Sequence, residues 1–182
     1  MELTQTSIAE VYVLKPNVYE DDRGFFMETF QAERFRMSGI PTNFVQDNHS
    51  GSKQGVLRGL HYQIQRPQGK LVRVASGEVF DVAVDLRKKS DTFGSWVGRI
   101  LSAQNKLEIW IPPGFAHGFY VLSEWADLLY KVTESYAPEW DRTLRWDDPK
   151  IGIDWPLIDG KAPKLSEKDE AGQFLAEADL FE

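Results

Sequence analysis

Short stretches in which apolar and polar residues alternate, or in which β-branched and aromatic residues dominate, recur along the whole chain. They fall at residues 10–14, 25–29, 43–46, 56–63, 70–75, 78–86, 96–101, 107–111, 119–122 and 126–133. Alternation is the period of a β-strand, whose successive side chains point to opposite faces. Between residues 80 and 86 every even-numbered residue is apolar, whereas Asp81 and Asp85 share the opposite face. We therefore expect one face of this strand to be wetter than the other.

Turns rich in Gly and Pro separate these stretches, at 66–69, 76–77 and 112–114. Only residues 31–37 and the tail around 171–176 have a helical pattern, and no linker or repeat interrupts the chain. About ten strands without parallel crossover helices predict one all-β domain over 1–182, an antiparallel β-barrel or sandwich of the jelly-roll kind with short peripheral helices. Barrels of this size bind ligands in their interior or mouth.

Composition narrows the function classes. The 182 residues are 42% hydrophobic and 13% aromatic, enough for one core. A net charge of −7 argues against a nucleic-acid partner, so an anionic ligand must be held by a few placed cations. The chain has no cysteine, no export signal at its start and no apolar run that could span a membrane. A cytoplasmic protein without a membrane partner is the expectation.

His61 is one of only three histidines and lies in the strand-like stretch 56–63. Strict alternation puts Arg58 and His61 on opposite faces, so the two can serve one site only if the strand bulges near Gly59 or Arg58 curls over the barrel rim. For an arbitrary histidine in a β domain, a half-buried side chain that bonds a backbone carbonyl, with the arginine on the solvent face, is the more common case. The residues alone leave both interpretations open.

Other polar residues stand out by their place in the strand period. Lys70 shares a face with valines, where a cation is costly unless it meets an anionic partner. Tyr130 and Tyr136 are each explained equally well as core aromatics or as site residues. Gln46 and Asn48 share a face and could present two amides to a ligand, although a polar loop is the simpler interpretation.

His117 follows a Pro-Pro-Gly-Phe-Ala turn and raises the question of a metal. Metal-binding barrels of the cupin class typically carry two histidines one residue apart. Here that position reads His61-Tyr62-Gln63, and three scattered histidines without cysteine make a poor site for a transition metal. We expect no catalytic metal.

Seven segments, in order between residues 22 and 169, together carry a specific resemblance. They are Asp22-Arg23-Gly24-Phe25-Phe26-Met27-Glu28, Gln46-Asp47-Asn48-His49-Ser50, Val56-Leu57-Arg58-Gly59-Leu60-His61-Tyr62-Gln63, Gln68-Gly69-Lys70-Leu71-Val72-Arg73-Val74, Ile111-Pro112-Pro113-Gly114-Phe115-Ala116-His117-Gly118-Phe119, Tyr130-Lys131-Val132-Thr133 and Leu165-Ser166-Glu167-Lys168-Asp169. The chain resembles the dTDP-4-dehydrorhamnose 3,5-epimerase family of nucleotide-sugar enzymes.

The resemblance implies a cupin-like jelly roll without metal or cofactor, and a homodimer. It implies epimerisation of dTDP-4-dehydro-6-deoxy-D-glucose at C3 and C5 to dTDP-4-dehydro-L-rhamnose. The sequence leaves open whether this step leads to dTDP-L-rhamnose and cell-envelope polysaccharide or to another deoxysugar. It implies His61 as general base with Asp169 as its partner, Tyr130 as general acid and Lys70 beside the enolate. The residues it implies for binding the nucleotide sugar are Arg23, Phe26, Glu28, Gln46, Asn48, Arg58, His117, Tyr136, Asp141 and Lys168, with Tyr136 stacking on thymine. Asp141 departs from the family pattern, which often has Glu there.

Alternatives of two classes remain open at this point. The same residues permit a C3-only or C5-only epimerase or a 3,4-ketoisomerase of dTDP-4-keto sugars, because the outcome depends on how the sugar lies and which face is reprotonated. A carbohydrate-binding cupin without catalysis belongs to a different class. Arg23 lies on an early segment that could cross a dimer interface, so we expect each pocket to borrow residues from a partner subunit.

Overall fold

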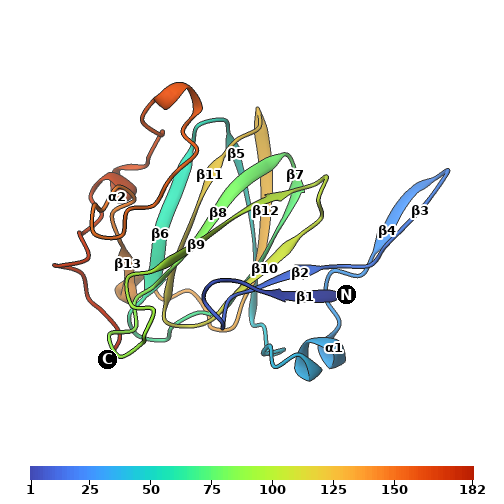
Figure 1. The fold of residues 1–182 in the computed structure, drawn as a ribbon, viewed down its shortest axis with the longest axis horizontal. Coiled ribbons are helices and arrows are strands. Elements are labelled where there is room, and N and C mark those ends of the chain that lie inside the picture. Colours follow the sequence, from blue (N-terminus) through green and yellow to red (C-terminus); the bar gives the residue numbers. More distant parts are fainter.

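Two antiparallel sheets face each other in the computed structural model, which describes residues 1–182 (Figure 1). The strands are β1 (Glu2–Gln5), β2 (Tyr12–Lys15), β3 (Val18–Asp21), β4 (Gly24–Met27), β5 (Gln46–Lys53), β6 (Leu57–Gln63), β7 (Lys70–Ser76), β8 (Glu78–Asp85), β9 (Trp96–Ser102), β10 (Glu108–Ile111), β11 (Phe115–Val121), β12 (Trp125–Val132) and β13 (Asp141–Thr143). One sheet has the order β1-β2-β10-β7-β12-β5 and the other β13-β6-β11-β8-β9, while β3 and β4 form a separate hairpin that projects from the body. The predicted all-β jelly-roll fold is confirmed.

The helices are few and short. They are α1 (Ala32–Met37), α2 (Glu167–Glu170) and the single 3-10 turns η1 (Pro138–Trp140) and η2 (Ile158–Gly160). Helix α1 confirms the helical pattern at 31–37. The helix expected around 171–176 is wrong, because the helical turn ends at Glu170 and the following residues bridge back to the body, Gln173 pairing with Leu144.

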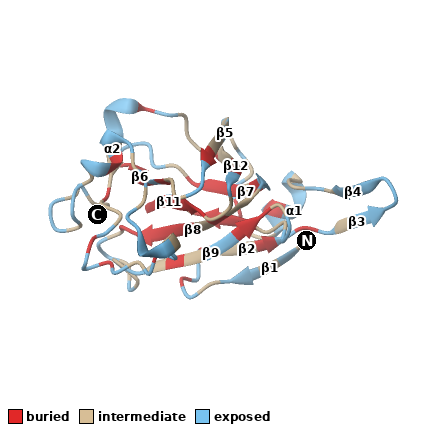
Figure 2. Ribbon diagram, turned by 90° about the horizontal axis from the view of Figure 1, so that it is seen from above, coloured by how far each residue is buried: buried red, intermediate tan, exposed pale blue.

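The interior between the sheets is a cluster of buried apolar side chains. Val72 and Leu128 from the six-stranded sheet meet Ala83 and Phe119 from the five-stranded sheet. Figure 2 shows this core as the buried strands β8 and β11, in contrast to the exposed β3–β4 hairpin. Because the two sheets touch through this core, side chains from both can converge on one interior site.

Strand β8 corrects the expectation of a wetter face. The division of faces was right, but both faces are buried, and Asp81 and Asp85 are each 0% exposed. The even-numbered residues pack in a second cluster under the C-terminal part of the chain, which includes Trp155. The odd-numbered residues face the interior. Alternation reports which residues share a face, and it does not report what covers that face.

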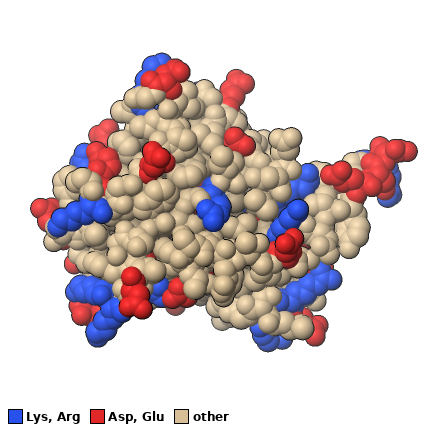
Figure 3. Space-filling model, viewed as in Figure 1, with Lys and Arg blue, Asp and Glu red and all other residues tan.

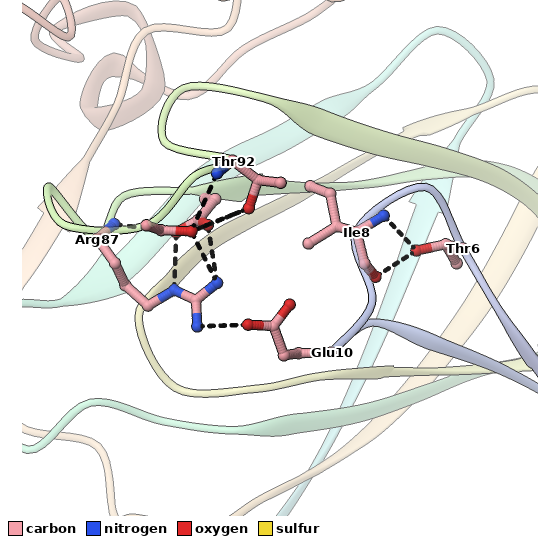
Figure 4. A network of polar contacts seen from close by, with 7 residues as sticks. Thr6, Ile8, Glu10, Arg87 and Thr92 are labelled. Atoms are coloured by element: carbon pink, nitrogen blue, oxygen red, sulfur yellow. Dashed lines mark hydrogen bonds and ion pairs between the residues drawn. The ribbon is translucent and has the colours of Figure 1, made fainter.

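Asp85 is fully buried yet fully bonded. Figure 4 shows the polar network around it, with Arg87, Thr92 and Glu10 labelled. Its carboxylate accepts hydrogen bonds from Arg87 Nε at 2.8 Å, Ser90 Oγ at 2.6 Å and Thr92 Oγ1 at 2.7 Å. Arg87 also donates to Glu10 Oε1 at 3.0 Å, which ties the end of β8 to the segment before β2. Burial acts to raise the pKa of Asp85, but these hydrogen bonds outweigh it and lower the pKa to about 2.

Charges are scattered over the molecule. On the face in Figure 3, lysines and arginines are dispersed, while acidic residues gather at the projecting hairpin, which carries Glu20, Asp21 and Asp22. None of the helices is long and apolar enough to cross a membrane.

Candidate active site

A cavity of about 350 Å³ is lined by residues from both sheets, from the segment that follows β12 and from α2. Ten of the residues singled out from the sequence line it: Gln46, Asn48, Arg58, His61, Lys70, His117, Tyr130, Tyr136, Asp141 and Lys168. Strands β6 and β11 of the five-stranded sheet supply His61 and His117, and β7 and β12 of the six-stranded sheet supply Lys70 and Tyr130. One sheet therefore supplies two imidazole groups to the cavity, and the other supplies an ammonium group and a phenol.

A bulge in β6 brings Arg58 and His61 to the same cavity. Along β11, His117 pairs with His61 and Phe119 with Arg58, so three steps of β6 oppose two steps of β11. Gly59 lies within this bulge at φ +118°, and a Cβ there would meet the Cα of Gly118 at 2.6 Å. The bulge expected near Gly59 is confirmed, and the close approach of the two strands requires glycine.

His61 is held by a buried carboxylate. Its Nε2 lies 2.5 Å from Asp169 Oδ1, and the Asp169 side chain is 4% exposed. Burial acts to raise the pKa of Asp169, but hydrogen bonds from His61 and Ser166 outweigh it and lower the pKa. Asp169 therefore stays ionised, fixes the orientation of the imidazole and stabilises it when it gains a proton.

Lys70 is buried directly beside this pair. Its Nζ donates to the backbone oxygen of His61 at 3.1 Å, and the residue is only 6% exposed. Burial lowers the pKa of Lys70 to about 8. A cation buried in a cavity that excludes water can strongly stabilise negative charge that develops on a ligand.

Tyr130 projects into the cavity from the other sheet, near His117. The ring centroids of the two residues are 6.5 Å apart. Burial raises the pKa of Tyr130, so its hydroxyl keeps its proton at neutral pH.

His117 Nε2 lies 2.8 Å from Oδ2 of the fully buried Asp81. The sequence analysis placed Asp81 on a wetter face and missed this contact, because alternation separates the two faces of β8 and does not say which of them lines the interior.

Three further predicted residues meet at one edge of the cavity. The Tyr136 hydroxyl donates to Asp141 Oδ2 at 2.9 Å, and Lys168 forms an ion pair with the same carboxylate. Hydrogen bonding to Asp141 raises the pKa of Tyr136. Gln46 Nε2 donates to Asn48 Oδ1 at 2.8 Å, which confirms that these two amides share a face.

Arg23, Phe26 and Glu28 do not reach the cavity of their own chain. They lie on or beside the β3–β4 hairpin, which projects away from the sheets (Figure 1). Arg23 bonds Asp21, Phe26 is 69% exposed, and Glu28 pairs with Arg34 at 2.9 Å. Within one chain, the structure separates these three residues from the ten that line the cavity.

The residues present no obvious metal centre. No group of three or more His, Cys, Asp or Glu side chains lies in an arrangement that could hold a metal ion. The two histidines in the cavity are each bonded to a carboxylate. The expectation of no catalytic metal stays a prediction.

Comparison with known proteins identifies the family. The family model described as dTDP-4-dehydrorhamnose 3,5-epimerase matches residues 5–177. The chain belongs to the dTDP-4-dehydrorhamnose 3,5-epimerase family. Among members of this epimerase family, the protein of that description from Pseudomonas aeruginosa is 58% identical over 182 residues, covering 100% of this chain and 99% of its own length.

Two solved structures extend the comparison. The dTDP-6-deoxy-D-glucose-3,5-epimerase of Legionella pneumophila, in complex with dTDP-4-keto-L-rhamnose, is 55% identical with a TM-score of 0.93, over 97% of this chain and 93% of that one. A 3'-monoepimerase from Streptomyces bikiniensis, in complex with dTDP-quinovose, is 34% identical with a TM-score of 0.88, over 94% and 87% of the two chains. The resemblance drawn from the sequence is thus confirmed, and the same fold also serves a monoepimerase.

Proposed function

We propose that the protein converts dTDP-4-dehydro-6-deoxy-D-glucose to dTDP-4-dehydro-L-rhamnose by epimerisation at C3 and C5. The observation that carries this proposal is that His61 and Tyr130 enter one cavity from opposite sheets, with Lys70 beside His61. The high identity to 3,5-epimerases over nearly the whole chain supports the same substrate.

The chemistry explains why one site serves two carbons. C3 and C5 both lie next to the C4 ketone, so removal of either proton gives an enolate whose charge rests on the C4 oxygen. A cation in a dry cavity stabilises that charge far more strongly than it would in water. We assign this role to Lys70. The reaction moves protons and no electrons, so it consumes no oxidant or reductant.

Inversion needs a base on one face of the sugar ring and an acid on the other. His61 accepts the proton, and its contact with Asp169 at 2.5 Å supports the imidazolium that results. Tyr130 donates a proton to the opposite face, because its raised pKa keeps the hydroxyl protonated. Their placement on two different sheets leaves room for the sugar between them.

The remaining lining residues bind the nucleotide sugar. Arg58 and Lys168 supply the cations that a diphosphate needs in a chain of net charge −7. Gln46, Asn48 and His117 offer hydrogen bonds, and Tyr136 offers a ring that is 54% exposed for stacking on thymine. In this assignment Asp141 takes the place of the Glu that relatives often have, and it holds the Tyr136 hydroxyl.

We assign Arg23, Phe26 and Glu28 to the pocket of a partner subunit in a homodimer. The hairpin that carries them projects from the body and exposes Tyr19, Phe25 and Phe26 at 64%, 59% and 69%. Large exposed aromatics on a projecting hairpin favour contact with another chain. A fully active monomer that binds the nucleotide sugar with unchanged affinity would refute the shared pocket. Location in the cytoplasm stays a prediction.

Incubation with substrate in deuterated water tests the function. A 3,5-epimerase introduces deuterium at both C3 and C5 and gives the L-configured product. Label at C3 alone or C5 alone would instead establish a monoepimerase, which the Streptomyces bikiniensis neighbour makes the main competing activity. A migrated ketone would indicate a 3,4-ketoisomerase. Absence of deuterium from the sugar, with the ketone unmoved, would indicate a binding protein without catalytic activity.

A further inference from the structure

Tyr136 lies on a segment without regular secondary structure. Residues 133–137 connect β12 to η1 and form no strand ladder. The Tyr136 ring is 54% exposed at the edge of the cavity. A stacking ring on an irregular segment needs other contacts to fix its position, because backbone groups outside ladders must find partners elsewhere.

Side-chain amides supply most of those contacts. Gln63 Oε1 accepts from the backbone N–H of Ala137 at 2.8 Å, and Gln63 Nε2 donates to the backbone oxygens of Arg66 at 2.8 Å and Ser135 at 3.3 Å. Gln68 Nε2 donates to the backbone oxygen of Glu134 at 2.8 Å. Gln63 and Gln68 therefore hold the backbone on both sides of Tyr136, and the N–H of Tyr136 itself donates to Gln46 Oε1 at 3.0 Å.

Gln63 is built into the body of the protein. It is 3% exposed, and it lies on β6 two residues after His61. Ala137, which it holds, is 2% exposed. Every donor and acceptor of the Gln63 amide faces a backbone group, so its side chain is fully used for holding the chain.

We propose that the side-chain amides of Gln63 and Gln68 form a clamp that positions Tyr136 against the nucleotide base of the dTDP-sugar. Both are positioning residues, since Gln63 bonds the backbone of Ser135 and Ala137 and Gln68 bonds that of Glu134, on either side of Tyr136. The inference rests on the proposed role of Tyr136 in binding thymine. Through β6, the clamp ties the base-stacking ring to the strand that carries His61.

Gln63→Met tests the clamp, because methionine has a similar length and no polar amide. Three backbone groups then lose their partners, and we expect the dissociation constant for dTDP and the KM for the sugar each to rise about tenfold. The value of kcat should change far less, because His61, Lys70 and Tyr130 keep their contacts. Gln68→Met breaks one bond of the clamp and should cause a smaller rise in the same direction.

Gln54→Met is the matched control. Gln54 Nε2 also donates to a backbone oxygen, that of Leu122 at 2.7 Å, but the residue does not line the cavity. It should leave dTDP binding, KM and kcat unchanged. If Gln63→Met fails to fold, Gln68→Met with the same measurements decides the question.

A double-mutant cycle with Tyr136→Ala separates the clamp from the role of Tyr136 itself. If the clamp acts through the ring, Gln63→Met should cost less than about twofold in dTDP affinity once Tyr136 is alanine. An undiminished loss in that background overturns the inference. If Tyr136→Ala weakens dTDP binding and both glutamine variants bind normally, the clamp is refuted and the role of Tyr136 stands. If Tyr136→Ala binds dTDP normally, both fail.

Discussion

Replacing Lys70 with methionine should make the protein more stable and remove its catalysis. Lys70 is 6% exposed, its charge is disfavoured by burial, and its only hydrogen bond within the chain runs to the backbone oxygen of His61. Methionine keeps most of the apolar stem and removes the ammonium group. Removing a buried cation that destabilises the folded protein but is needed for catalysis should increase stability and abolish activity.

The magnitude follows from the pKa of Lys70. Burial lowers it from 10.5 to about 8. At 1.36 kcal/mol for each pKa unit, the charged form costs the folded state about 3 kcal/mol. Loss of the bond to His61 offsets roughly 1.5 kcal/mol of that gain. The net gain of about 1–2 kcal/mol corresponds to a rise in Tm of about 2–8 °C for a chain of this size.

The stability difference between Lys70→Met and the wild type should change with pH in a defined direction. The folded pKa lies below the unfolded one, so the penalty is fully present below pH 8 and disappears as the pH rises from about 8 to 10.5. Denaturant unfolding of both proteins at pH 7 and pH 10.5 should therefore show a stability advantage for Lys70→Met that shrinks at the higher pH. A variant less stable than the wild type at pH 7, or a gap that does not change with pH, would refute the reasoning.

Further expected outcomes concern catalysis, the bulge and two buried acids. Proton exchange at the sugar should decline as the pH rises through about 8, where Lys70 loses its charge, and a rate that stays flat to pH 10 would contradict its role. Gly59→Ala should cost about 2 kcal/mol or more of stability and most of the activity, since its Cβ would meet Gly118 at 2.6 Å; urea unfolding and turnover check both. Asp85→Ala should cost about 3 kcal/mol by the same unfolding measurement, because Arg87, Ser90 and Thr92 lose their shared acceptor, and a neutral result would be incompatible with the network. Burial raises the pKa of Glu108 to about 8, so the free energy of unfolding should fall by roughly 4 kcal/mol between pH 4.5 and 8, and Glu108→Gln should remove that slope.

The sequence pattern predicted the strands that have apolar partners. Alternation located β6, β7, β8 and β12, because each buries at least one face. It missed β1, β3 and β13, which are short; β1 and β13 are edge strands, and β3 pairs only with β4 in the projecting hairpin. The stretch expected at 43–46 stops where β5 begins, since β5 is an edge strand of mostly polar residues that pairs only with β12. Pairing with a neighbour overrides weak local preference in such strands.

The site was predicted unevenly, for physical reasons. Motif positions identified ten of the 15 residues that line the cavity, and the parity conflict between Arg58 and His61 anticipated a bulge. The burial of Asp81 could not be read from alternation, because both faces of β8 are covered. Its even-numbered apolar residues pack under the C-terminal half of the chain, while Asp81 faces the interior between the sheets. The bonds of Gln63 join residues about seventy positions apart, and no local pattern reports such contacts.

The most direct test of the central claim is deuterium incorporation by His61→Ala. The account predicts that the variant incorporates no deuterium at C3 or C5 above the uncatalysed background, while it binds dTDP within about twofold of the wild type, since the base acts only on the sugar. Incorporation at a rate near that of the wild type would show that another group removes the proton. That result would contradict the site as assigned.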